Sequence, residues 1–459
     1  MRDFLMKALR RRRALWVGAG MVFVSGCAVG PEFSAPDISL PQQFSTKTAQ
    51  AQPAMEGWWR RFQDPALDQL VDRALRDNLT LAQAQARVAA AQAQATAVDP
   101  YLDVTGRVAA QTSDGVNSAG SSSQSVLGTL SFTGARARRI ESANAALSAA
   151  RNDADAARLT VLSNVIIAVI DLRFISASLA LRQQDQARQQ RSLRDIQVLR
   201  DNGAATVTEV TQAEALIAET QIDIANQTGE LARQANRVST LLGLPAGLGA
   251  VRPSTGARQP LPQGGAPQGI PADLIRNRPD IRAAEDRYRA AVADIGVAEA
   301  ARYPSLSLTG SITARSGATD APAGILGAAI NIPVFDQGAR RAEVNRREAV
   351  AFGALLDWRA RVLLAVEDVE TALATLDASS RALRAANRLT SLRQTALDQS
   401  RDLLGNQAIT ISDFLDREVA LSQARAARAR ARRDLAVNYV LLQIAQGAQR
   451  PAAAGTAPS

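Results

Sequence analysis

The chain has 459 residues, no histidine, one cysteine, and 53 basic against 44 acidic residues. The absence of histidine excludes a Ser–His catalytic pair and a His-ligated metal site, and no Gly-rich loop contains the lysine of a phosphate-binding P-loop. Six of the basic residues and one acid lie in the first 26 positions, so 47 basic and 43 acidic residues follow, and net charge gives little support for nucleic-acid binding.

The N-terminus has the order of an export signal. Basic residues within the first 13 positions precede an apolar stretch at 14–24, which is too short for the roughly 20 residues of a membrane span. The stretch ends in Val24-Ser25-Gly26-Cys27, which resembles a lipobox, whose cysteine is acylated after cleavage. Cys27 is therefore the predicted lipid-attachment site, with a free cysteine in an ordinary secretory signal as the alternative. Ala28 follows where inner-membrane lipoproteins tend to have Asp, so the resemblance implies the outer membrane.

The rest of the chain repeats itself with an offset of 204 residues. Four separate anchors share this offset: Pro100-Tyr101-Leu102-Asp103-Val104-Thr105-Gly106 with Pro304-Ser305-Leu306-Ser307-Leu308-Thr309-Gly310, Gly134-Ala135-Arg136 with Gly338-Ala339-Arg340, Asn202, Ala204 and Thr206 with Asn406, Ala408 and Thr410, and Gly243 with Gly447. Further upstream the offset falls to 200, and this difference is close to one helical turn, which keeps the buried face in register. The pattern predicts duplication of a whole structural unit.

Each copy predicts the same succession of elements. A helix at 64–98 or 272–301 is followed by two strands, a long helix at 135–200 or 339–404, a break at 202–207 or 406–411, and a last helix that ends near Gly243 or Gly447. The long helix would extend about 100 Å, which suits a conduit or a spacer. The predicted domains are a signal at 1–26, a lipidated segment at 27–63, repeats at 64–243 and 272–447, a linker at 244–271, and a flexible tail at 448–459.

The predicted strands alternate in polarity. In residues 305–315, Leu306, Leu308, Ile312 and Ala314 share one face, and mainly Ser and Thr occupy the other, as a strand between lipid and a wet lumen requires. Residues 102–108 alternate likewise, and second strands are predicted at 126–132 and 326–332. A soluble hairpin is the alternative. No apolar run after Cys27 is expected to span a membrane as a helix, so a crossing would use strands.

Closure of such a sheet predicts a trimer. Four strands cannot form a barrel, and eight strands from two chains would fill their own interior with side chains. Twelve strands from three chains leave a lumen. We therefore expect a mainly α fold with a small β part, in which each copy has long antiparallel helices and two strands, assembled as a trimeric α-barrel with a 12-stranded transmembrane β-barrel.

Four segments together resemble the outer-membrane factors of the TolC/NodT type, in the lipoprotein branch of drug-efflux channels. They are Cys27-Ala28-Val29-Gly30-Pro31-Glu32-Phe33, Trp58-Trp59-Arg60-Arg61-Phe62-Gln63-Asp64-Pro65, Arg278-Pro279-Asp280-Ile281-Arg282-Ala283-Ala284-Glu285, and Ile332-Pro333-Val334-Phe335-Asp336-Gln337-Gly338. The resemblance implies a passive exit duct for small molecules in a tripartite efflux pump. The protein would assemble as a homotrimer, and its partners would be a periplasmic adaptor, an inner-membrane RND-type pump and outer-membrane lipid. No nucleic acid, no metal and no cofactor besides the lipid on Cys27 are expected.

The resemblance also places the closed periplasmic end of the duct at the two helix breaks. Adaptor-docking candidates are Asn202, Gly203, Ala204, Asn406, Gln407 and Ala408, where Gln407 departs from the glycine that Gly203 retains. Gate candidates are Asp413, Asp416 and Glu209, because three copies of each carboxylate in a narrow mouth would favour cations. The alternative is that the acids only cap the first turn of the returning helix.

Two other functions fit parts of the pattern. A lipid-anchored periplasmic scaffold or adaptor without a pore would share the long helices and the anchor, but it would not need alternating strands in both copies. An outer-membrane duct of a type I secretion system is the second. Enzyme activity is not expected, because carboxylates such as Glu367 and Glu370 lie at helical spacing in Arg-rich helices and suit solvated faces.

Overall fold

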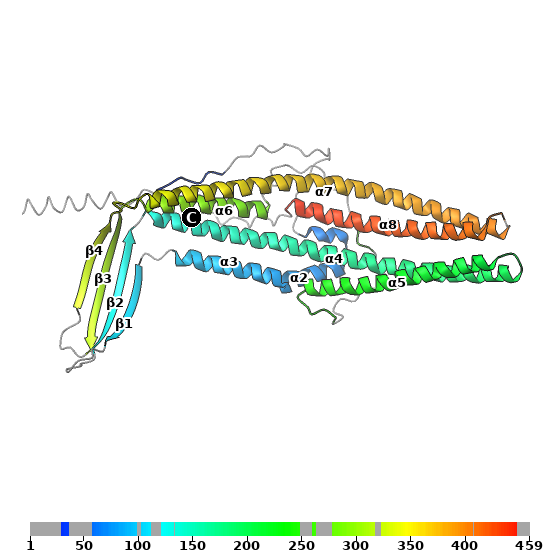
Figure 1. Cartoon of the computed structure of the whole chain (residues 1–459), viewed down its shortest axis with the longest axis horizontal. Coiled ribbons are helices and arrows are strands. Elements are labelled where there is room, and N and C mark those ends of the chain that lie inside the picture. Colours follow the sequence, from blue (N-terminus) through cyan, green and yellow to red (C-terminus); the bar gives the residue numbers. More distant parts are fainter. Residues whose placement is uncertain are drawn as a thin grey trace, which may run out of the picture. The chain divides into compact units, whose positions relative to one another are not determined.

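The computed structural model describes residues 29–35, 57–98, 102–111, 121–132, 134–247, 259–262, 278–316, 323–406 and 408–447 (Figure 1). Cys27 and Gln407 lie outside these residues. The chain divides into two compact units. Unit 1 contains residues 1–38, 86–153 and 282–361, and unit 2 contains residues 39–85, 154–281 and 362–459. Each sequence repeat contributes to both units, and each unit is described by itself.

The two copies form helices of equal length. The helices α4 (Ala135–Asp201) and α7 (Ala339–Gly405) have 67 residues each, and α5 (Val207–Leu241) and α8 (Ile411–Ala445) have 35 each. Every one of these boundaries differs between the copies by the 204 residues of the sequence repeat. The predicted long helices and the predicted break after each of them are therefore confirmed.

The helix predicted at 64–98 is wrong as a single element, because Asn78 interrupts it. The chain forms η1 (Trp58–Phe62), α2 (Pro65–Asp77) and α3 (Leu79–Ala97). Asn78 has extended backbone, and its Oδ1 accepts from the backbone N–H groups of Thr80 at 2.9 Å and Leu81 at 3.3 Å. Its Nδ2 donates to the Leu241 carbonyl at 2.8 Å. Asn78 thus begins α3 as an N-cap and ties this joint to the end of α5.

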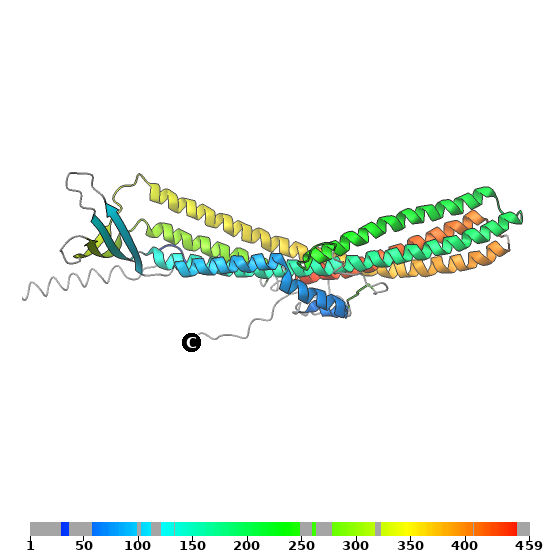
Figure 2. The same ribbon diagram turned by 90° about the horizontal axis from the view of Figure 1, so that it is seen from below.

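Unit 1 contains the sheet and parts of four helices, which Figures 1 and 2 show beside one another. The helix α6 (Pro279–Ala300) packs on α7 through the apolar side chains of Val292, Ile295 and Val344. On its other side α6 contacts α4, where Arg287 pairs with Asp153. Beyond α4, Arg151 donates to Gln92 of α3, so α7, α6, α4 and α3 follow one another in that order. In the second copy the predicted start at 272 lies outside the described residues.

The residues after Cys27 are held on unit 1 by Arg138 of α4. This guanidinium is largely buried, and it donates to the carbonyls of Val29 and Gly30 at 3.2 Å each. Phe33 then packs edge-on against Tyr288, with ring centroids 5.6 Å apart. The segment that follows the predicted lipid site is therefore a structured part of unit 1.

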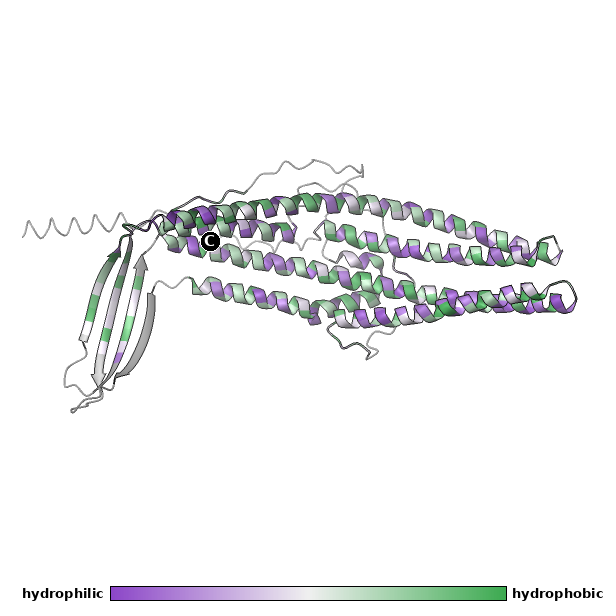
Figure 3. Ribbon diagram, in the orientation of Figure 1, coloured by the Kyte–Doolittle hydropathy of each residue, from purple (hydrophilic) through white to green (hydrophobic). Residues whose placement is uncertain are grey.

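The sheet is antiparallel throughout, in the order β1 (Leu102–Gln111), β2 (Ser121–Phe132), β3 (Ser305–Ser316) and β4 (Ala323–Asn331). The register pairs Val126 with Ile312, Leu130 with Leu308, and Leu306 with Ile330. The predicted apolar residues of the two copies therefore share rows across β2, β3 and β4. Figure 3 colours the described residues of these strands by hydropathy. The second strands begin earlier than predicted, at Ser121 and Ala323.

The expectation that no apolar run after Cys27 could span a membrane as a helix needs correction. An 18-residue window of α4 is long and apolar enough by composition. Within α4, Val165, Ile166 and Ile170 are fully buried in unit 2, and the Ile170 carbonyl accepts from Gln259 at 3.3 Å. These side chains belong to the core of unit 2, and 39% of the apolar window is buried.

Candidate functional site

The two turns that reverse the chain in unit 2 have closely similar geometry. We call the α4–α5 turn and the α7–α8 turn the first and second tips. In the first tip, Ala204 donates its N–H to the Leu199 carbonyl at 2.8 Å, and in the second tip Ala408 donates to Leu403 at 2.8 Å. Gly203 has a φ of 77° with open space around its missing Cβ, so the left-handed backbone, rather than crowding, favours glycine there.

The other docking candidates that the structure describes are exposed at these tips. The Asn202 side chain donates from Nδ2 to the Val198 carbonyl at 2.9 Å, which closes the last turn of α4. Asn406 donates its N–H to the Asp402 carbonyl at 3.2 Å. The adaptor-docking role of these residues stays a prediction.

Each returning helix begins with a capping box. In the second tip, Thr410 Oγ1 accepts from the N–H of Asp413 at 3.0 Å, while Asp413 Oδ2 accepts from the N–H and the hydroxyl of Thr410 at 3.2 and 2.7 Å. In the first tip, Thr206 and Glu209 form the same reciprocal bonds. Two of the three gate candidates therefore also fix the start of a helix.

These bonds control the charge of Asp413. Hydrogen bonds from the hydroxyl and then the backbone of Thr410 hold the pKa of Asp413 below its ordinary value, because they favour the ionised carboxylate. The capping box is therefore complete above the ordinary Asp range and is lost only as the pH falls through this lowered pKa.

Asp416 differs from the other two gate candidates. It lies one helical turn after Asp413 with an exposed side chain, and no group among the described residues bonds to its carboxylate. Its charge is thus free for a second copy or for an ion. The predicted ring of carboxylates remains a prediction, since one chain supplies one copy of each side chain.

An apolar cluster joins the four helices that form the two tips. It contains Ile196, Val210, Ala213, Leu397, Ile411, Phe414, Leu415 and Leu421, contributed by α4, α5, α7 and α8. Burial of these side chains stabilises the contact between the two hairpins. A displacement of the helices at one tip therefore alters the packing of the helices at the other.

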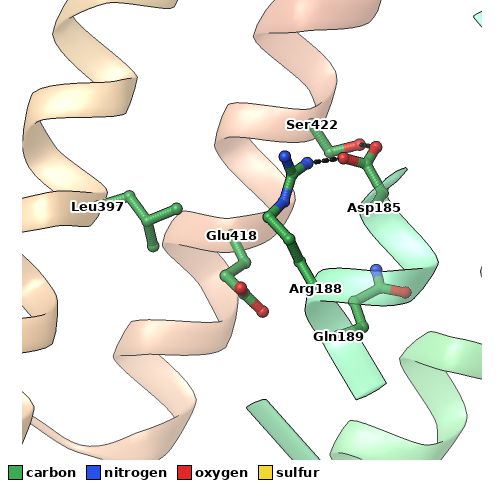
Figure 4. A pocket seen from close by; sticks show the side chains of 6 residues that line it. All are labelled: Asp185, Arg188, Gln189, Leu397, Glu418 and Ser422. Atoms are coloured by element: carbon green, nitrogen blue, oxygen red, sulfur yellow. Dashed lines mark hydrogen bonds and ion pairs between the residues drawn. The ribbon is translucent and has the colours of Figure 1, made fainter. Parts of the chain in front are cut away.

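A buried polar cluster follows on from this apolar cluster, between α4 and α8 (Figure 4). Asp185 accepts from Ser422 Oγ at 2.5 Å and pairs with Arg188. Arg182 donates to Ser422 Oγ at 2.8 Å, and it pairs with Asp223 of α5 at 3.4 Å. These bonds link three helices close to the tips.

Glu418 of α8 is the exception in the polar cluster. Its side chain is largely buried, and Oε1 accepts from the Ser192 hydroxyl of α4 at 3.1 Å. Its Oε2 is buried without a hydrogen-bond partner among the described residues. Burial raises the pKa of Glu418, and the Ser192 hydrogen bond and the nearby arginines oppose that shift only in part.

The sequence reasoning missed this cluster, although a signal was present. Ile411, Phe414, Leu415, Glu418 and Ser422 recur at spacings of three and four residues along α8. A carboxylate in such a stripe occupies a core position of the helix, where charges are rarely buried without a partner. In a helix rich in Arg and Ala, the stripe was not distinguished from a solvated face.

Comparison with known proteins places this arrangement of paired hairpins and strands in a family. The family described as outer membrane efflux protein matches residues 70–244 and 270–448, one segment in each repeat. The chain belongs to the outer membrane efflux protein family. Nodulation protein T of Rhizobium leguminosarum bv. trifolii is 34% identical over 449 residues, which cover 93% of this chain and 95% of that protein.

Other members match most of the length of this efflux protein. The cation efflux system protein CusC of Escherichia coli (strain K12) is 27% identical over 421 residues, covering 88% of this chain and 92% of CusC. The solved structure of the outer-membrane channel OprN matches with a TM-score of 0.84 and 29% identity, covering 92% of this chain and 99% of OprN. The predicted resemblance, the efflux role and the outer-membrane location are thereby confirmed.

Proposed function

We propose that three copies of this efflux protein form one passive exit duct across the outer membrane, gated at the tips. The observation that carries the proposal is an apolar sheet face that no part of the described chain covers. Ile312 is 62% exposed and Leu326 is 92% exposed, and both lie on the face that the register assembles from β2, β3 and β4. An apolar face of this kind suits the lipid side of a transmembrane strand.

The strand order supports closure between copies. Among the described strands, β1 and β4 each pair on one side only, and they run in opposite directions. The β4 edge of one copy can therefore pair antiparallel with the β1 edge of the next, without a break in the alternation. Three copies give twelve strands, which satisfy every edge and enclose a lumen.

The helices of unit 2 also leave apolar surface open at their outer elements. Leu363 and Leu364 of α7 and Ile222 of α5 are each more than half exposed. The helices follow in the order α7, α8, α4 and α5, because Thr390 of α7 donates to α8 and Arg433 of α8 pairs with Asp171 of α4. Neighbouring copies would cover both outer helices and complete a helical wall.

The tips are the proposed gate and docking surface. Asp413 and Asp416, in three copies each, would form a carboxylate ring at the mouth of the duct, and Glu209 would act in the first tip. Membership of the efflux family supports a periplasmic adaptor and an inner-membrane RND-type pump as partners. The exposed turns around Ala204 and Ala408 offer that adaptor two similar but non-identical surfaces per copy.

A lipid on Cys27 is the second proposed membrane attachment. The segment from Val29 to Phe33 is held on unit 1 by Arg138 and Tyr288, so an acyl chain two residues upstream would be tethered to the same unit as the sheet. The anchor would then assist insertion, while the barrel spans the membrane.

Conductance in planar bilayers tests the proposed duct. Purified mature protein should be trimeric and should conduct ions weakly, and a variant with Asp413→Ala and Asp416→Ala should conduct more at rest. A trimer that never conducts, even with the altered tip, would instead support a lipid-anchored scaffold without a pore. A stable monomer in mild detergent would contradict both the duct and its closure.

A further inference from the structure

Glu418 is a buried carboxyl group without a counter-ion among the described residues. It is 8% exposed and lies two turns into α8, beside the apolar cluster that joins the tips. The only group that bonds to it among the described residues is the Ser192 hydroxyl, at 3.1 Å from Oε1. A neutral donor of this kind does not compensate a buried negative charge.

The arginines around Glu418 are engaged elsewhere. On α4, Arg188 pairs with Asp185, and Arg191 donates to its own helix at the Ala187 carbonyl. On α7, Arg401 lies 3.5 Å from Asp398. Among the described residues no guanidinium reaches the Glu418 carboxyl within ion-pair distance, and the carboxylate of Asp185 lines the same cavity. Asp185 is itself paired with Arg188, so this guanidinium is engaged by Asp185 rather than by Glu418.

Two acceptor oxygens at this cavity need a donor. Glu418 Oε2 and Gln189 Oε1 are both buried without a hydrogen-bond partner in the described part of the chain, and both residues line the cavity shown in Figure 4. The cavity measures about 10 Å³, close to what one water molecule requires. One proton on Oε2 would remove the unpaired charge and create an O–H donor that faces this water or the Gln189 amide.

We propose that Glu418 is a protonation-controlled latch, whose neutral acid holds α8 against α4 beside the tips and whose ionisation releases that contact. The proposal rests on the proposed gate and adds its regulation. Ionisation transfers the proton to water and leaves a buried carboxylate without a cation. Separation of α8 from α4 then hydrates the charge and so favours opening.

The sign of the pH dependence follows from burial. Because burial raises the pKa of Glu418, the packed arrangement has its full stability below the ordinary Glu range and loses it as the pH rises through the raised pKa. Each unit by which the pKa of Glu418 differs between the packed and separated states changes the closed-to-open ratio by up to about tenfold per copy. A pH above the raised pKa should therefore ease opening, and a pH below it should keep the tips closed.

Infrared difference spectroscopy tests the protonation without any need for a pore. In a pH titration the parent trimer should keep the carbonyl band of a protonated carboxylic acid to a pH above the ordinary Glu range, and Glu418→Gln should remove that band. Glu214→Gln, at an exposed carboxylate of α5, is the matched control and should leave it in place. A parent spectrum without this band, or a band that persists in Glu418→Gln, would overturn the proposal.

Single-channel recording at pH 5 to 9 then tests the latch. The open probability of the parent and of Glu214→Gln should rise with pH, and that of Glu418→Gln should stay low and flat. Ser192→Ala removes the hydrogen bond that favours ionisation, so its transition should move to higher pH, which supplies a second test if Glu418→Gln does not fold. A parent-like pH profile in Glu418→Gln or in Ser192→Ala would refute the latch. Absence of conductance in every protein, the parent included, would refute the duct itself.

Discussion

A charge placed on the apolar sheet face should prevent assembly, and the same charge one residue away should not. Ile312 lies on the face proposed to contact lipid, and Ser311 lies on the opposite face of the same strand. We predict that Ile312→Arg strongly reduces folded trimer in the outer membrane, while Ser311→Arg is tolerated. The two variants share the charge, the side-chain size and the strand, so they differ only in the face that carries the arginine.

The magnitude follows from the position of Ile312 in β3. The strand has 12 residues, and Ile312 lies between one and two residues from its centre. At about 3.3 Å per residue this is roughly 5 Å along the strand, well inside an apolar band about 25 Å tall. An arginine on the lipid face near the midplane destabilises a barrel by about 2–4 kcal/mol. Even the lower value amounts to roughly 6 kcal/mol of lost stability when three copies carry it.

Heat-modifiable gel migration of outer-membrane fractions measures the outcome. The parent and Ser311→Arg should migrate as trimers without heating and as monomers after it, and Ile312→Arg should show little trimer. Leu308→Arg and Thr309→Arg repeat the comparison at a second pair of opposite faces. Equal trimer yields from both faces, or a larger loss for the Ser and Thr variants, would refute the lipid-facing assignment.

Three further predictions concern the tips, the anchor and the α2–α3 joint. Replacing both Asp413 and Asp416 with Ala should raise resting conductance and weaken cation preference and divalent block, and parent-like selectivity would make them helix caps only. Changing Cys27 to Ser should abolish palmitate incorporation, and a labelled variant would refute the lipid site. Asn78→Ala should lower the free energy of unfolding by about 2 kcal/mol in denaturant titrations, because it removes an N-cap and the bond to the Leu241 carbonyl. No measurable decrease in the free energy of unfolding would show that water replaces both the N-cap and the bond to the Leu241 carbonyl.

The sequence predicts the repeated parts of the fold well, because each repeat carries its own boundary signals. Thr206 and Thr410 begin the returning helices as N-caps, and the alternation around Leu308 correctly assigns the face of β3. Asn78 was missed because the interruption of a regular apolar pattern by one capping residue depends on a partner, Leu241, that lies 163 positions away.

The candidate site was predictable only where it is local. The capping acids follow their threonines at fixed spacing, so their location in the tips could be read from the chain. Glu418 could not be assigned in this way, because its burial depends on α4, and its lack of a counter-ion depends on the engagement of Arg188 with Asp185. Such a group is recognised only when all neighbouring side chains are placed.

Electron cryo-microscopy of the detergent-purified mature protein tests the central claim most directly. We predict three copies around one axis, with the β4 edge of each copy paired antiparallel to the β1 edge of the next in a single closed twelve-stranded barrel. Monomers with an open sheet, closure within one copy, or any other number of copies in the ring would contradict it.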